Sequence, residues 1–365
     1  MASLSELEET TAPVAAPKKP SQRVVGLDVV RGLLMAYVII VIHGIYWLRL
    51  APLPHASALL FEMPLIFMVS GAAYYYGQIA WTNSIAGGAR NYLNYLISRG
   101  VRILAPYFAY ALVCALIVIY LRSHDAGDAL RHWLDPYRIG GAHNWLFLNW
   151  HLWFITPFLG VTILLPLLAR LPIFGRIPLW AWAIIGSLIM LAIDLAPLEP
   201  LRLPQMIVFY SLWALFGFGL ARAPTRFSVR NYAVVLVLAL SALAAALIVL
   251  DEQTTPDMQA NKFPPNAIFF LFSCVWVSAF LIAAKFISDK TIEKLAANPL
   301  LKPFIRSGYS IYLWQGVGYT AAFWAGTRWG VNIWLIWAAA IALTVVLGLL
   351  ASPLERIRLR LKPAK

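Results

Sequence analysis

Long apolar stretches, each close to the length of a membrane-spanning helix, follow one another along almost the whole chain. A helix needs about 20 apolar residues to cross the hydrocarbon core of a bilayer. Such stretches can be drawn at ten places, which are 26–49, 57–80, 101–121, 146–168, 177–197, 205–222, 231–250, 266–287, 308–326 and 331–352. The pattern therefore predicts an all-α fold, a polytopic integral membrane bundle of about ten transmembrane helices.

Basic residues lie in short runs between these stretches and alternate in abundance from loop to loop. With the N-terminus inside, the inner segments hold about three times as many lysines and arginines as the outer ones. This bias predicts that both termini are cytoplasmic, which requires an even number of spans. The net charge of +13 is therefore explained by topology rather than by nucleic-acid binding.

The composition excludes an ordinary soluble protein. Hydrophobic residues make up 61% of the chain and charged residues only 12%, whereas soluble domains carry about a quarter charged residues. Cys114 and Cys274 lie far apart in apolar runs, so we expect packing roles for both, with no disulfide framework and no metal site.

The two ends of the chain and its longest loop lie outside the predicted bundle. Residues 1–23 are rich in Ala, Pro, Glu and Lys and have no signal-peptide pattern, which predicts a disordered cytoplasmic tail. The membrane domain is expected at 24–353 and a basic cytoplasmic tail at 354–365. The loop at about 122–144 is predicted to lie outside, where it could help to bind a polar substrate. Its charged and histidine residues are Asp125, Asp128, Asp135, Arg131, Arg138, His124, His132 and His143.

Few ionisable residues lie within the apolar stretches, and each is costly in lipid, so each is a candidate functional residue. They are Asp28, Arg31, His43, Glu62, His151 and Asp194. Asp28 and Arg31 are three residues apart on one helix face and could instead form a simple ion pair. Asp194 is expected at an outer helix end, where a structural role is the simplest interpretation.

His43 is the strongest candidate for chemistry. It lies about 18 Å beyond Arg31 along the first predicted helix, well inside the bilayer. Imidazole titrates near neutral pH, so His43 could act as a general base that deprotonates a hydroxyl. A nucleophilic relay of an acyl group is a second option, and a hydrogen bond to a neighbouring helix is the structural alternative.

Three further motifs carry candidate residues at the ends of predicted spans. Glu62 begins the second span within FEMPLIFMVSG, where it could also be a solvated interfacial carboxylate. His151 and Trp153 lie in NWHLWF at the outer start of the fourth span, where tryptophan is common as an interfacial residue. Arg99 and Arg102 lie at the cytosolic start of the third span, where they could bind a phosphate or only set the topology.

The order of these motifs resembles that of a known family. The chain carries LDVVRG with a following histidine, then FEMPLIFMVSG, RGVRILAPY, HLWF and SGYSIYLWQ. Over nearly its whole length it resembles the acyltransferase 3 family, membrane-bound acyltransferases that O-acetylate or succinylate cell-envelope glycans, exopolysaccharides and lipid-linked sugars. The resemblance implies a multi-pass enzyme of the cell (inner) membrane, with no bound cofactor or metal.

The resemblance also implies two substrates and assigns residues to them. The donor would be acyl-CoA, usually acetyl-CoA, from the cytosolic side, and the acceptor a hydroxyl of a saccharide or lipid-linked glycan. Arg31 and His43 would be the family's catalytic arginine and histidine, with Arg31, Arg99 and Arg102 binding the donor. The acceptor-binding residues would be Glu62, His151, Trp153, Tyr312 and Gln315, while Ser70, Tyr309 or Tyr312 could oppose oxyanion charge.

Two departures from the family pattern bear on activity. Eleven residues, Gly32 to Ile42, separate Arg31 from His43, whereas the family usually has ten. On an ideal helix this places the two side chains roughly 120° apart, and a π-bulge between them would restore their alignment. The second departure is Gln315, at a position where many members have histidine, since glutamine cannot titrate.

Two other functions remain open from the sequence. Buried charges would also suit a flippase or exporter of a lipid-linked glycan, although no internal repeat is apparent. The spacing change and Gln315 would also fit a catalytically degenerate member of the family. The sequence does not identify the acceptor, the acyl group or the oligomeric state.

Overall fold

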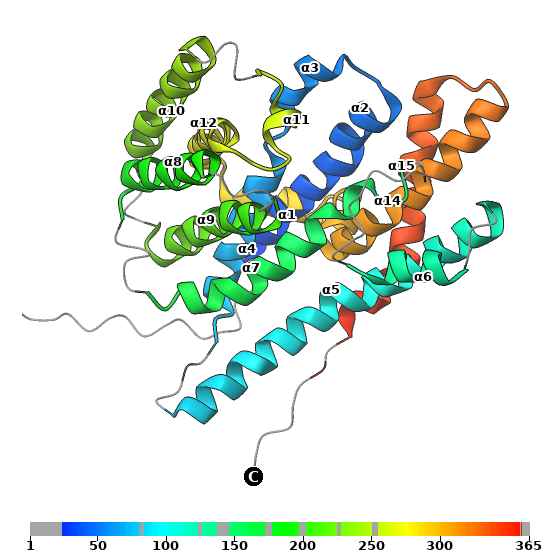
Figure 1. Cartoon of the computed structure of the whole chain (residues 1–365), viewed down its shortest axis with the longest axis horizontal. Helices are drawn as coiled ribbons and strands as arrows, with labels where there is room; N and C mark the ends of the chain where they lie inside the picture. Colours follow the sequence, from blue (N-terminus) through cyan, green and yellow to red (C-terminus); the bar gives the residue numbers. More distant parts are fainter. Residues whose placement is uncertain are drawn as a thin grey trace, which may run out of the picture.

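The fold is helical throughout the part of the chain that the structure describes (Figure 1). This computed structural model describes residues 24–79, 81, 84–122, 126–136, 145, 147–171, 177–196, 202–224, 228–249, 255–357 and 359. Within those ranges there is one isolated β-bridge, between Lys262 and Pro265, and no strand. Residues 1–23, residues 358 and 360–365 of the predicted C-terminal tail, and the loop residues His124, Asp125, Arg138 and His143 lie outside them.

The helices follow in an order close to that of the predicted spans. They are α1 (Val25–Tyr37), a π-helical turn η1 (Val38–Ile42), α2 (His43–Leu48), α3 (Leu53–Ala56), η2 (Ser57–Leu59), α4 (Glu62–Tyr76), α5 (Ile85–Arg122), α6 (Ala126–Leu134), η3 (Trp150–Phe154), α7 (Ile155–Leu168), α8 (Leu179–Leu195), α9 (Arg202–Arg222), α10 (Val229–Val249), α11 (Met258–Asn261), α12 (Ala267–Ala284), α13 (Asp289–Ala297), α14 (Lys302–Arg328), α15 (Ile333–Ala351) and η5 (Ser352–Arg356).

Eight helices of the described part are long and apolar enough to cross a membrane, which confirms the all-α polytopic fold. The two other predicted spans correspond to α8, which has only 17 residues, and α14, which has 27 residues but a more polar composition. Much of α14 is buried, and its buried Ser310 and Gln315 face protein rather than lipid. The total of ten spans therefore stays a prediction.

The third span differs from its predicted bounds. The expected stretch 101–121 is only the second half of α5, which has 38 residues and would be about 57 Å long at 1.5 Å per residue. That length exceeds the thickness of the hydrocarbon core, so one end of α5 extends beyond it. Arg99 and Arg102 consequently lie midway along α5, and their place at the cytosolic start of the membrane-spanning part stays a prediction.

The centre of the bundle is the contact between α4 and α9, whose backbones approach through glycine. Gly71 of α4 lies against the Ala214 carbonyl, and Gly217 of α9 lies against the Met68 carbonyl. Small residues allow such close approach between helices in membranes. At the periphery, α10 and α15 expose large apolar side chains such as Leu238 and Leu350, as expected for surfaces that face lipid. Cys114 and Cys274 are buried and free, consistent with packing roles.

The first span contains the expected π-helical distortion. The π turn Val38–Ile42 lies between Arg31 and His43, and side chains of α14 and α15 bond to its backbone. Tyr319 donates to the carbonyl of Ile39 (2.6 Å), and Trp337 donates to that of Ile40 (2.9 Å). A π turn accommodates about one extra residue, so it compensates for the additional residue in this chain.

Candidate functional site

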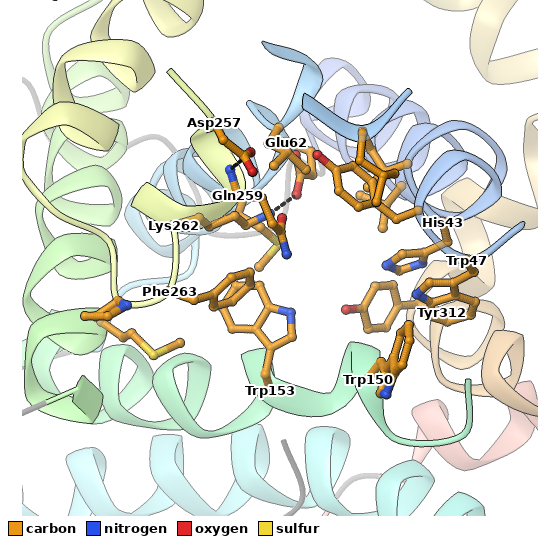
Figure 2. Close-up of a pocket in the computed structure, with 18 of the residues that line it drawn as sticks. His43, Trp47, Glu62, Trp150, Trp153, Asp257, Gln259, Lys262, Phe263 and Tyr312 are labelled. Atoms are coloured by element: carbon orange, nitrogen blue, oxygen red, sulfur yellow. Dashed lines mark hydrogen bonds and ion pairs between the residues drawn. The ribbon is translucent and has the colours of Figure 1, made fainter. Parts of the chain in front are cut away.

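A cavity of about 580 Å³ lies between the first span, the start of α4, η3 and the α11 region. Its lining residues include Arg49, directly after α2, Leu53, the first residue of α3, and Asp257, directly before α11. That end of the bundle is the one predicted to face outside. The volume is within the range of small-molecule sites. Figure 2 shows the acidic and basic side chains on one side of this cavity and His43, Trp47 and Tyr312 on the other.

His43 lines the cavity and is held in one orientation. Its Nδ1 lies 2.6 Å from Oε1 of Gln315 on α14, and its ring stacks on Trp47 with centroids 4.2 Å apart. A carbonyl oxygen can only accept a hydrogen bond, so His43 carries its proton on Nδ1 and leaves Nε2 as a free base. The interhelical bond and the general-base hypothesis are therefore compatible.

Residues from η3 and α14 enclose the histidine from behind. The His151 ring is 6.4 Å from that of His43 and bonds through Nε2 to the carbonyl of Leu313 (3.0 Å). Tyr312 lies 6.1 Å from His43 between ring centroids and donates to the His151 carbonyl (2.7 Å). His151 is 1% exposed, so it is part of the bundle core.

A buried ion pair forms the opposite wall. Lys262 Nζ lies 2.6 Å from Oε1 of Glu62, and these side chains are only 4% and 3% exposed. The ammonium also lies over the rings of Trp153 and Phe263, at 5.5 and 5.6 Å from their centroids. The alternative that Glu62 is a solvated interfacial carboxylate is therefore wrong.

Arg31 lies away from this cavity, midway along α1 and toward the N-terminal end of the first span. It forms the expected ion pair with Asp28 (3.0 Å), and its side chain is 46% exposed. Arg31 also donates to the carbonyl of Ile305 (3.5 Å) on α14, the helix that carries Gln315. Since Arg31 and His43 both contact α14, the π turn places them on one face of the first span.

α14 is broken close to this arginine. Ser307 departs from helical geometry (φ −136°, ψ 27°), and the backbone N–H of Ser310 donates to the carboxylate of Glu355. One turn beyond Ile305, Tyr309 donates to the carbonyl of Ile103 on α5 (2.9 Å), the residue after Arg102. Arg31 and the middle of α5 thus contact α14 within one helical turn of each other.

The remaining predicted residues have local partners. Arg99 lies over the ring of Tyr95, 5.7 Å from its centroid. Ser70 bonds to the carbonyl of Ile66 in its own helix, and neither Ser70 nor Tyr309 lines the cavity. Asp194 accepts from Gln205 and from the first backbone N–H of α12, which confirms its structural role.

The structure thus separates the predicted site into two groups. His43, Glu62, Trp153 and Tyr312 line one cavity, with His151 and Gln315 directly behind it, while Arg31, Arg99 and Arg102 lie elsewhere. Sequence reasoning missed several lining residues, namely Tyr46, Trp47, Trp150, Arg202, Asp257, Gln259 and Lys262. Trp47 could have been found from its position one helical turn after His43.

The longest loop contributes less to the cavity than its charged residues suggested. Its described part contains α6, which packs on α5 through buried Ala129 and Trp133, and the Trp133 carbonyl accepts from Tyr107 (2.7 Å). None of the cavity-lining residues of the described chain comes from this loop.

The fold and the site together define a multi-pass membrane protein in which a partly buried, oriented imidazole faces an aromatic-lined cavity. The family model for the acyltransferase domain matches residues 24–352, nearly the whole chain. The protein therefore belongs to the acyltransferase 3 family of membrane acyltransferases. Comparison with curated proteins found no match, and comparison with solved structures found none either.

Proposed function

We propose that this protein transfers an acyl group, acetyl in the first instance, from acyl-CoA to a hydroxyl of a cell-surface saccharide or lipid-linked glycan in the cell (inner) membrane. The observation that carries the proposal is His43, whose Nδ1 is bonded to Gln315 and whose other nitrogen is available at the cavity. The family membership supplies the general activity.

The reaction needs only the two substrates and a base. His43 Nε2 removes the proton of the acceptor hydroxyl as its oxygen attacks the thioester carbonyl. The tetrahedral intermediate collapses with cleavage of the carbon–sulfur bond, and the departing thiolate takes the proton from the imidazolium. The products are an O-acyl ester and free CoA, and His43 returns to its starting state.

The two substrates are proposed to enter from opposite ends. The cavity at the α3 and α11 end receives the acceptor, and the end that carries Arg31 receives the donor. Arg31, Arg99 and Arg102 would bind the CoA phosphates, to which arginine is well suited. The distance of about 18 Å between Arg31 and His43 along the helix is comparable with an extended pantetheine arm.

Mass spectrometry of envelope glycans and lipids, with and without the protein, tests this proposal. We expect one acyl mass increment to disappear when the protein is absent, which identifies the acyl group and the acceptor together. In liposomes the purified chain should consume acetyl-CoA or another acyl-CoA in an acceptor-dependent way, faster with acceptor present than by hydrolysis alone. Movement of a saccharide across the membrane without consumption of acyl-CoA would show an exporter instead.

Gln315 is proposed to position His43, because its carbonyl fixes the proton on Nδ1. Replacement of Gln315 with Leu removes this acceptor, and we expect kcat to fall about 10–100-fold with the KM for acyl-CoA within about twofold. Gln315→Glu keeps an acceptor oxygen and should retain more activity than Gln315→Leu. Equal losses in the two variants, or a loss confined to KM, would contradict this role.

A further inference from the structure

The wall opposite His43 contains charged groups that general acyl transfer does not require. Glu62 and Lys262 are almost fully buried, and only one oxygen of the carboxylate is used in their ion pair. Within the described chain, Oε2 of Glu62 is buried and has no hydrogen-bond partner. Buried acceptors without partners are rare and costly, which points to a group that is absent here and donates to this oxygen.

Stability does not explain why the ion pair is there. Removing two charges from water costs several kcal/mol per ion, and apolar replacement of buried pairs is often neutral or stabilising. Glu62 is the first residue of α4, where the helix dipole favours a negative charge, but this holds without Lys262. The pair is therefore better explained by a ligand.

The pair offers one acceptor and one donor at short separation. Lys262 Nζ uses one N–H on Oε1 of Glu62 and can direct another toward the cavity. Neighbouring hydroxyl groups on a sugar ring have a separation comparable with that between the ammonium of Lys262 and the carboxylate of Glu62. One hydroxyl can therefore donate to Oε2 of Glu62 while the next accepts from Lys262. A net charge of zero and a free carboxylate oxygen disfavour an anionic group at this position.

Aromatic side chains beside the pair complete a subsite for a ring. Trp153 and Phe263 meet edge to face at 4.7 Å, and both lie next to the Lys262 ammonium. Trp150 and Trp47 line the same cavity, toward His43 (Figure 2). Their faces can pack against the C–H face of a pyranose.

We infer that Glu62 and Lys262 bind a neutral vicinal diol of the acceptor sugar, and so present another hydroxyl of the same ring or the next one to His43. This inference rests on the proposed function and specifies its acceptor as a neutral polyhydroxylated ring. Lys262 is then a residue that determines acceptor specificity.

The first test measures binding alone, so that it does not depend on catalysis. The probe is trans-cyclohexane-1,2-diol, with cyclohexanol as the matched control, added to the full chain in lipid nanodiscs. The diol should raise the Tm of the wild type in a dose-dependent way and at concentrations at least tenfold below those needed for cyclohexanol. The double variant Glu62→Gln with Lys262→Met removes both charges and so leaves no lone buried charge. In this variant the difference between the diol and cyclohexanol in their effect on Tm should disappear. Equal effects of the two probes on the wild type, or an unchanged difference in the variant, would overturn the inference.

The second test separates binding of the acceptor from the chemistry. Labelled acetyl-CoA and the saccharide fraction of the cell envelope are supplied, and both transfer to saccharide and hydrolysis by water are measured. The double variant should lose at least tenfold in transfer while acyl-CoA hydrolysis stays within twofold, whereas the exposed His55→Gln control should lose neither. Transfer at the wild-type level in the double variant would overturn the inference. If the wild type binds the diol but consumes no acyl-CoA, the proposed function fails and the subsite remains supported.

Discussion

Replacement of His43 with Ala should lower acyl transfer by at least about 100-fold, because general-base catalysis contributes about 10²–10⁴-fold. No other histidine lines the cavity in the described chain, and His151 is buried behind it with Nε2 bonded to a carbonyl. The loss should appear in kcat, since His43 would act on the hydroxyl in the transition state rather than hold the donor. Transfer of label from acyl-CoA to the envelope saccharide fraction measures it directly.

The matched control is His55→Ala, because His55 is exposed on α3 and does not line the cavity. It should transfer at the wild-type rate. His43→Gln keeps a polar side chain beside Gln315 but has no basic nitrogen, so it should be as inactive as His43→Ala. If His43→Ala retained transfer while folded, the base would be another group. If envelope acylation were unaffected by the variant in cells, the catalytically degenerate alternative would be favoured.

The sequence allowed much of this cavity to be predicted, because ionisable residues are conspicuous in apolar spans. His43 and Glu62 were identified in this way, and Tyr312 and Gln315 followed from the resemblance to the family. Lys262 could not be found, since a lysine in a polar loop is unremarkable. Its partner lies 200 residues away in the sequence, and only the folded bundle brings the two together.

The π turn Val38–Ile42 in the first span was likewise predictable only in part. The resemblance to the family, which usually has ten residues between its arginine and histidine, showed one additional residue here, and helix geometry then suggested a π-bulge to accommodate it. The groups that bond to its backbone, Tyr319 and Trp337, come from α14 and α15 and had no signal in the sequence. Hydropathy likewise identified the lipid-facing helices but gave the wrong start for α5, whose first half contains polar residues such as Arg90 and Asn94.

The bundle that holds this site depends on the close approach of α4 and α9. A Cβ atom on Gly71 would lie 1.7 Å from the carbonyl oxygen of Ala214, and one on Gly217 would lie 1.9 Å from that of Met68. Both obstacles are backbone atoms, which cannot move aside by a change of rotamer. α4 begins with Glu62 and α9 contributes Met206 to the cavity, so separating these helices would also displace the wall of the cavity that contains Glu62.

Gly71→Ala should therefore destabilise the protein by about 3 kcal/mol or more, at or above the upper end of ordinary overpacking costs. The expected result is a several-fold loss of monodisperse protein in detergent and a lower Tm, both measured by size-exclusion chromatography of heated samples. Gly100→Ala in α5 is the matched control, because its Cβ would meet no atom within 4 Å and alanine favours a helix by about 1 kcal/mol. If Gly71→Ala matched Gly100→Ala in yield and Tm, the two helices could not be in backbone contact. The arrangement of Glu62 opposite His43 would then lose its structural basis.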